Sequence, residues 1–155
     1  MPDEPTPERA NEVADLLVRI YEIHEAVIAE TGGLPGLRDA TMLHAAIARP
    51  FATFGGQELY PTDFEKAAAL FHSLIKSHPF MDGTKRTAFA SALFFLERCG
   101  YLLPESLPLN PVVEFCVAVA EENLRLSHGE ISKPRSISDI AEWLRKLLNP
   151  TIERN

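Results

Sequence analysis

The segment from Thr84 to Cys99 is apolar on nearly every side when it is wound as a helix, and no other part of the sequence constrains the fold as strongly. Apolar residues recur at helical spacing along one side, and two further phenylalanines widen it: Ala88, Phe89, Ala92, Leu93 and Leu96, with Phe94 and Phe95. Such a helix is stable only when other elements cover it. We therefore expect it at the centre of the fold, ending at Gly100.

A second buried helix is predicted immediately before the first. Thr62 and Glu65 form a capping box, after which apolar residues recur at helical spacing as far as Ile75. Pro79 disfavours helical backbone at the residue before it, so we expect this helix to end near Ser77. A short loop, HPFMDGTKR at residues 78–86, then lies between two buried helices.

The rest of the chain predicts four more helices, which makes about six in one all-α domain. They are expected at 7–30 after the cap Thr6, at 39–49, from Asn110 or Pro111 to Gly129, and from Ser136 or Ser138 onward. A chain of 155 residues suits one domain over 1–155, with its core at about 7–148 and loose ends at 1–5 and 150–155. Only FATFGGQELYP, at 51–61, is a candidate for extended structure.

Composition excludes several classes of protein. The formal net charge of −7 argues against nucleic acid as a direct partner. No apolar run approaches a membrane span and the first residues lack signal-peptide features, so we expect a cytoplasmic protein without a membrane partner. Cys99 and Cys116 lie in apolar helical segments, where buried thiols without a disulfide or metal are expected.

The loop at 78–86 carries the residue types of a site for a magnesium-bound polyphosphate. Free amides at a helix start attract phosphate, and Gly83 lets an anion approach the backbone closely. Lys85 and Arg86 add full positive charges beside those amides. Asp82 supplies the hard oxygen that a magnesium ion needs.

His78, at the other end of the loop, is a candidate general base for an incoming hydroxyl. A P-loop is excluded, because Ser77 and Thr84 stand where GxxxxGK[ST] needs glycines and a helix rather than a strand precedes the loop. The histidines within predicted helices, including His24 and His72, are expected to be satisfied core or surface side chains rather than ligands.

The stretch HPFMDGTKR resembles the Fic motif HPFx[DE]GN[GK]R, and its lysine matches the death-on-curing (Doc) branch of the Fic/Doc family. The likeness extends upstream through GLRDATMLHAAIARP and FGGQELYPT and downstream to AEWL, so it covers most of the chain. One position departs from the motif, because Thr84 stands at the family's asparagine. The Thr84 hydroxyl is expected to cap the helix as asparagine does, but it lacks the amide's two donors.

The resemblance implies a role for each residue of the loop. His78 would be the general base, Asp82 the Mg²⁺ ligand, Gly83 part of the anion hole, Arg86 a phosphate clamp and Phe80 the anchor in the core, with Gly83, Thr84, Lys85 and Arg86 binding the nucleotide. Lysine at position 85 goes with an inverted nucleotide and transfer of its γ-phosphate. Family members with glycine at that position transfer AMP instead.

The function implied by the resemblance is that of a toxin acting on a protein. It would transfer the γ-phosphoryl group of ATP to a hydroxyl of its target, by analogy a threonine of elongation factor Tu, and an antitoxin would restrain it. Residues Phe54, Gly55, Gly56, Gln57, Glu58 and Leu59 would be the flap that holds the target beside His78. AMP transfer and a non-catalytic binding module remain as alternatives. The sequence has no [ST]xxxE[GN] inhibitory motif, so restraint is expected from a partner.

Overall fold

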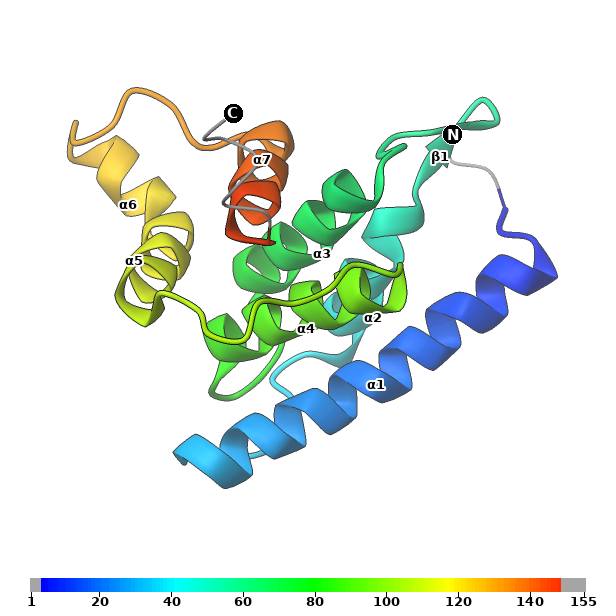
Figure 1. The fold of residues 1–155 in the computed structure, drawn as a ribbon, viewed down its shortest axis with the longest axis horizontal. Coiled ribbons are helices and arrows are strands. Elements are labelled where there is room, and N and C mark those ends of the chain that lie inside the picture. Colours follow the sequence, from blue (N-terminus) through cyan, green and yellow to red (C-terminus); the bar gives the residue numbers. More distant parts are fainter. Residues whose placement is uncertain (1–3, 149–155) are drawn as a thin grey trace.

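The computed structural model describes residues 4–148, whose regular structure is mainly helical (Figure 1). Of the loose ends expected at 1–5 and 150–155, residues 1–3 and 150–155 lie outside the described residues. The elements are α1 (Pro7–Thr31), α2 (Ala40–Ala48), a 3₁₀ turn η1 (Arg49–Phe51), β1 (Thr53–Phe54), β2 (Gln57–Glu58), α3 (Asp63–Ser77), α4 (Thr84–Arg98), α5 (Leu109–Ala120), α6 (Glu122–Ser127) and α7 (Ile137–Leu148). The predicted all-α class is confirmed. None of the helices in this part of the chain is long and apolar enough to cross a bilayer.

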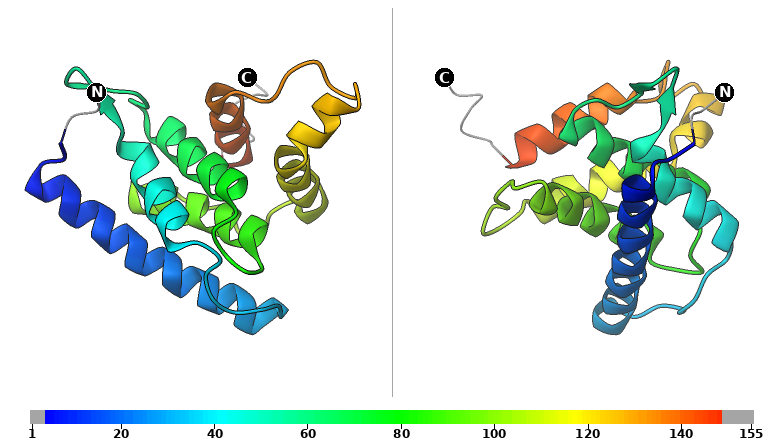
Figure 2. Two further views of the ribbon diagram at one scale, coloured as in Figure 1. Left: turned by 180° about the vertical axis from the view of Figure 1, so that it is seen from behind. Right: turned by 90° about the vertical axis from the view of Figure 1, so that its right-hand side faces the viewer.

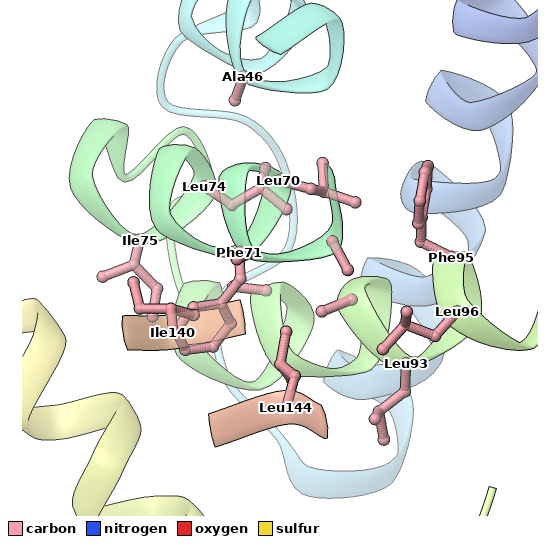
Figure 3. Close-up of a cluster of buried hydrophobic side chains, with 14 of the residues drawn as sticks. Ala46, Leu70, Phe71, Leu74, Ile75, Leu93, Phe95, Leu96, Ile140 and Leu144 are labelled. Carbon is pink, nitrogen blue, oxygen red and sulfur yellow. The ribbon is translucent and has the colours of Figure 1, made fainter. Parts of the chain in front are cut away.

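Helices α3 and α4 lie side by side at the centre, as their sequence pattern predicts. Helix α3 also packs against α7 and α2, while α1 runs along α4 on the outside (Figures 1 and 2). Figure 3 shows the apolar side chains that meet there: Ala46, Leu70, Phe71, Leu74, Ile75, Leu93, Phe95, Leu96, Ile140 and Leu144. Each fully buried leucine or phenylalanine stabilises the fold by about 1.5–3 kcal/mol. The two helices that flank the loop at 78–86 are therefore rigidly held.

Helix starts follow the capping residues that the sequence contains. The Thr62 hydroxyl accepts a hydrogen bond from the Glu65 amide at 3.1 Å, and the Thr6 hydroxyl accepts one from Arg9 at 3.2 Å. Of the two serines proposed for the last helix, Ser136 is the cap, because its hydroxyl accepts from the Asp139 amide at 3.1 Å. These caps satisfy amides that a helix start otherwise leaves unpaired.

The predicted fifth helix is in fact two helices, α5 and α6, separated by a turn at Glu121 with φ −97° and ψ 7°. The side chain of Glu122 is fully buried, and its carboxylate accepts a hydrogen bond from the Arg135 amide at 3.0 Å and pairs with Lys76 at 3.1 Å. Both partners belong to other parts of the chain, so the local pattern at 110–129 did not reveal the turn.

The extended segment predicted between α2 and α3 is a small hairpin, with Thr53 opposite Glu58 and Phe54 opposite Gln57. Glu58 pairs with Arg9 at 3.7 Å and Lys66 at 3.2 Å, which ties the hairpin to the beginnings of α1 and α3 (Figure 2).

The hairpin and His78 lie at opposite ends of α3. His78 follows the opposite end of α3, and a 15-residue helix is about 22 Å long. The resemblance placed the segment by its order in the sequence, whereas the length of α3 separates it from the loop. The role of residues 54–59 in target binding stays a prediction.

Candidate active site

The loop begins with a strained residue. Helix α3 ends at Ser77 as predicted, and His78 then adopts a left-handed conformation with φ 47° and ψ 60°. Among residues 4–148 it is the only non-glycine residue with positive φ. Such a conformation costs on the order of 1–3 kcal/mol and persists only where surrounding contacts impose it. His78 is exposed, so its imidazole is open to a ligand.

The contacts that impose this conformation come from residues 32–39, the connection between α1 and α2, which we call the strap. The Arg38 guanidinium donates to the carbonyl oxygens of His78 and Ser77, each at 2.6 Å. The Arg38 amide donates to the Pro79 carbonyl at 2.7 Å. Leu37 forms an antiparallel bridge with Phe80, so the strap fixes the loop much as a neighbouring strand would.

Phe80 anchors the loop in the protein core, where only 1% of its surface is exposed, as expected. Its ring stacks on that of His24 from α1, with centroids 3.9 Å apart and planes 9° apart. His24 is buried and hydrogen-bonded, as predicted for a satisfied core histidine. Its Nε2 lies 2.8 Å from the backbone carbonyl oxygen of Asp82.

The Asp82 carboxylate is held by two backbone amides. Its Oδ2 accepts from Leu34 at 3.2 Å and its Oδ1 from Gly83 at 2.8 Å. These hydrogen bonds lower the pKa of Asp82, with a further contribution from the positive charge of Arg86, whose Nη2 lies 3.8 Å from Oδ1. Asp82 is therefore ionised at neutral pH.

An ionised carboxylate beside a phosphate site fits a magnesium ion. Within residues 4–148, no group of three or more His, Cys, Asp or Glu side chains is arranged to hold a metal. Magnesium is commonly bound by one or two carboxylates, with phosphate oxygens and water as the other ligands. The residues present thus fit a magnesium ion that arrives with a nucleotide, with Asp82 as the protein ligand.

The start of α4 is open to an anion. Gly83, with φ 74°, occupies the cap position and offers no side chain to the first-turn amides. The expected capping role of Thr84 is therefore corrected: Thr84 is the first helical residue, and a helix needs its cap one position earlier. Its hydroxyl is buried, with 3% of the residue exposed, and has no hydrogen-bond partner in the described chain. An orphaned buried hydroxyl at this point fits a phosphate oxygen.

The two cations of the loop differ in their contacts. Lys85 is exposed and forms no hydrogen bond or ion pair within residues 4–148. Arg86 is tied to the end of α1, because its Nη1 donates to the Thr31 hydroxyl and lies 3.4 Å from the Gly32 carbonyl oxygen. Lys85 is therefore available to bind a ligand directly, whereas Arg86 would first have to break its contacts with Thr31 and Gly32.

A cavity of about 480 Å³ joins these groups, which lies within the usual range for small-molecule sites. One wall is the loop, with His78, Asp82, Gly83, Thr84, Lys85 and Arg86. The other wall is mainly apolar: Phe89, Leu109, Val112, Val113, Cys116 and Val117. Every predicted residue of the loop except the anchor Phe80 therefore faces one cavity, which combines a charged end with an apolar wall.

The cysteines take no part in this chemistry. Burial raises the pKa of Cys116 to about 11, so its thiol stays protonated in the cavity wall. Cys99, expected to be buried, is exposed, because it follows the last residue of α4 at the protein surface. Both are free thiols.

Sequence reasoning missed His24 as a neighbour of Asp82, together with Arg38 and Gly33. A Cβ atom on Gly33 would lie 2.6 Å from Asp82 Oδ2, so the carboxylate position depends on this glycine. The cluster TGGLPGLRD was a usable signal, since glycines so dense in a connector indicate close backbone approach. No local signal marked His24.

Comparison with known proteins links the strap and the loop to one family. Residues 16–96, which include both, match the model of the Fic/DOC family. The chain is 40% identical over 95 residues to Toxin Doc of Mycolicibacterium smegmatis, which covers 61% of this chain and 73% of that protein. It is 36% identical over 129 residues to Protein kinase doc of Escherichia phage P1, which covers 83% of this chain and 90% of that protein.

Proposed function

We propose, because this chain belongs to the Fic/DOC family, that it is a toxin that transfers the γ-phosphoryl group of ATP to a hydroxyl of a target protein. The observation that carries the proposal is the convergence of His78, the Asp82 carboxylate and the open start of α4 on one cavity. The similarity to a phage protein named as a protein kinase supports phosphoryl transfer in particular.

In the proposed reaction His78 is the general base. The imidazole takes the proton from the target hydroxyl, whose oxygen forms a bond to the γ-phosphorus. The bond between that phosphorus and the oxygen bridging to the β-phosphate breaks, and ADP leaves. General-base catalysis of this kind contributes roughly 10²–10⁴ to the rate. The strap serves this step, since Arg38 holds the carbonyl of His78 and so fixes the backbone from which the imidazole projects.

Phosphate binding falls to the beginning of α4. Thr84 and Lys85 both line the cavity, and the first-turn amides have no side-chain cap, so we assign the phosphate contacts to these amides, the Thr84 hydroxyl and the Lys85 ammonium. Arg86 joins them by leaving Thr31 and Gly32. A magnesium ion, held by Asp82, would neutralise charge on the phosphates.

Lys85 supports phosphoryl transfer over AMP transfer, because lysine at this position goes with the inverted nucleotide of the Doc branch. The apolar wall formed by α5 suits a nucleotide base, while the charged end suits the phosphates. In the AMP-transferring alternative, the α-phosphate and not the γ-phosphate would lie beside His78. The two alternatives therefore differ in which phosphate reaches the target.

Two segments are candidates for holding the target. The strap lies beside His78 and is exposed at Gly33, Leu34 and Pro35, so an extended peptide could reach the base along it. The hairpin, with Phe54 61% exposed and Leu59 47% exposed, is a candidate for contacts farther from the reacting hydroxyl. By family analogy, we propose a threonine of elongation factor Tu as the acceptor and an antitoxin protein as the restraining partner.

The test is intact-mass spectrometry of elongation factor Tu after incubation with the protein, ATP and Mg²⁺. A mass gain of one phosphoryl group, lost when His78 is replaced by asparagine, is the expected result. Asparagine is a suitable replacement because it tolerates the left-handed backbone, while its amide side chain cannot act as a general base. A mass gain of AMP would replace phosphoryl transfer with adenylylation. No gain, with no binding of Mg²⁺ and ATP by calorimetry, would favour the non-catalytic module.

A further inference from the structure

His24 lies outside the loop motif, 58 residues before Asp82 in the chain, yet it contacts the loop at two points. Its ring lies flat against Phe80, and its Nε2 reaches the carbonyl oxygen of Asp82. The residue is 4% exposed and does not line the cavity, so its role is not direct contact with a ligand. A buried phenylalanine could supply the stacking alone. The hydrogen bond needs a separate explanation.

We propose that His24 is a positioning residue that fixes the Asp82 carboxylate through the peptide bond between Asp82 and Gly83. A carbonyl oxygen accepts hydrogen bonds, so His24 donates from a protonated Nε2. The peptide unit is planar, with its C=O and N–H pointing in opposite directions. By holding the Asp82 carbonyl, His24 therefore also sets the direction of the Gly83 N–H, which donates to Asp82 Oδ1 at 2.8 Å.

The same peptide unit leads directly into α4. Gly83 is the cap residue, and its φ of 74° shows how sharply the chain turns there. Glycine resists rotation less than any other residue, so a contact from outside is needed to hold this peptide in one orientation. His24 supplies that contact from α1, while the Leu34 amide supplies the second hydrogen bond to the carboxylate. The peptide unit between Asp82 and Gly83 thus positions both the Asp82 carboxylate and the first amides of α4, and His24 holds this peptide unit in place.

Two substitutions separate this role from ordinary packing. His24→Phe keeps a ring against Phe80 and removes the donor. His24→Gln removes the ring but keeps an N–H that can reach the Asp82 carbonyl. The positioning role predicts that the phenylalanine variant is impaired and the glutamine variant is largely rescued. A packing role predicts the reverse order.

The first measurement is amide hydrogen exchange of the free protein, which requires no reaction. His24→Phe should raise exchange at residues 81–86 while leaving α3 and α7 protected, and His24→Gln should resemble the parent. Nitrogen NMR of the parent should show a proton on Nε2 of His24. An unprotonated Nε2, or unchanged exchange in His24→Phe, would overturn the proposal even if a variant folded poorly.

The second measurement is the binding of Mn²⁺, as a probe for Mg²⁺, in the presence of ADP, followed by electron paramagnetic resonance. His24→Phe should weaken the metal by roughly 10–100-fold, the usual effect of losing a group that orients a ligand, and His24→Gln by much less. Equal weakening in both variants would contradict the positioning role.

An activity measurement rests on the proposed function. His24→Phe should raise the Mg²⁺ concentration needed for half-maximal phosphorylation and restore most of kcat at saturating Mg²⁺. A structural defect would instead lower kcat at every metal concentration. If the parent transfers no phosphoryl group, the proposed function fails, while exchange and metal binding still decide the role of His24.

Discussion

Two charged clusters lie at the C-terminal end of α3, and they differ in where their charges find partners. In the first, which we call the ion cluster, Lys76 and Arg135 surround the fully buried Glu122. In the second, the loop, Lys85 is free and exposed among the described residues, and His78 faces a cavity. Lys76 and His78 are only two positions apart in the sequence. Lys76 nevertheless pairs with a buried carboxylate inside the protein, whereas His78 faces the cavity.

The ion cluster is closed, because its charges are satisfied within the protein. Burial alone would raise the pKa of Glu122, but hydrogen bonds from the Arg135 amide and from Lys76 outweigh it and lower the pKa. Lys76 also donates to the Val119 carbonyl at 2.8 Å. The loop is open, since the Thr84 hydroxyl has no partner in the described chain and the first-turn amides of α4 have no side-chain cap. The two clusters carry similar charges. They differ in whether those charges and polar groups have partners within the protein.

The largest expected effect is on the reaction rate when the loop loses its base. His78→Ala should lower phosphorylation by roughly 10²–10⁴ and leave nucleotide affinity nearly unchanged, because the imidazole acts on the target hydroxyl. Its free energy of unfolding should fall by about 1 kcal/mol or less, because the exposed side chain packs little but alanine adopts the left-handed backbone less readily than histidine. The rate is measured with labelled ATP, and toxicity should fall in parallel. A variant as toxic as the parent at equal expression would remove His78 from the mechanism.

The ion cluster should respond in the opposite way. Glu122→Gln removes the carboxylate from two cations and should lower the free energy of unfolding by about 2–3 kcal/mol, less than for a fully buried pair because both cations are partly exposed. Urea unfolding measures this loss. Glu121→Gln is the matched control, since Glu121 is exposed and pairs with Arg125 at 3.6 Å, and it should cost less than about 0.5 kcal/mol. Phosphorylation per folded molecule should stay at the parent level. A selective loss of activity would mean that the ion cluster is not merely structural.

The pH dependence of stability tests the same cluster. The folded protein holds the pKa of Glu122 below its ordinary 4.5, so the carboxylate stabilises the fold above that pH. This contribution should be lost as the pH falls below about 4.5 and through the lowered pKa. Glu122→Gln should lack that part of the acid transition. Identical acid transitions in the parent and the variant would contradict the direction of the shift.

The sequence predicted local features of the fold well, since a cap or a proline acts on its immediate neighbours. Thr62 and Pro79 marked the two ends of α3, and Ser136 was one of two predicted starts for α7. The apolar pattern also placed α4 at the centre. The residues of the loop that face the cavity were foreseen for the same reason, because they lie together in nine consecutive positions.

What the sequence could not show are contacts between distant segments. Arg38 binds His78 across 40 positions, and His24 binds Asp82 across 58, so no local pattern reports either pair. The break at Glu121 and the distance of the hairpin from His78 have the same origin. In both cases the relevant contact or spacing involves α3: Glu122, just after the break, pairs with Lys76 of α3, and the hairpin and His78 lie at the two ends of α3.

A smaller effect is expected when the support of the loop is altered but its residues are kept. Gly33→Ala places a Cβ atom 2.6 Å from Asp82 Oδ2, which displaces the carboxylate and should weaken metal-dependent activity by roughly 10–100-fold. Gly36→Ala is the matched control, because Gly36 also has positive φ, 97°, but its Cβ would meet nothing within 4 Å. Both variants carry backbone strain, so similar losses of stability are expected. Equal losses of Mg²⁺ binding, measured by calorimetry with ATP, would show that strain and not the collision matters.

The smallest expected effect concerns the orphaned hydroxyl of Thr84, and it decides whether the openness of the loop is functional. Thr87 also has a buried hydroxyl without a partner, but it does not line the cavity. Valine has nearly the same shape as threonine but lacks the hydroxyl. Replacing either threonine with valine therefore removes a buried, unpaired hydroxyl, and each variant should gain about 1 kcal/mol in the free energy of unfolding. Only Thr84→Val should also bind Mg²⁺ and ATP more weakly, by about tenfold, since a hydrogen bond to a charged phosphate is worth at least about 1.5 kcal/mol. Calorimetry and urea unfolding on both variants supply the two readouts. Equal nucleotide affinity in Thr84→Val and Thr87→Val would mean that the Thr84 hydroxyl does not contact the nucleotide. The difference between the loop and the ion cluster would then depend only on the first-turn amides and Lys85.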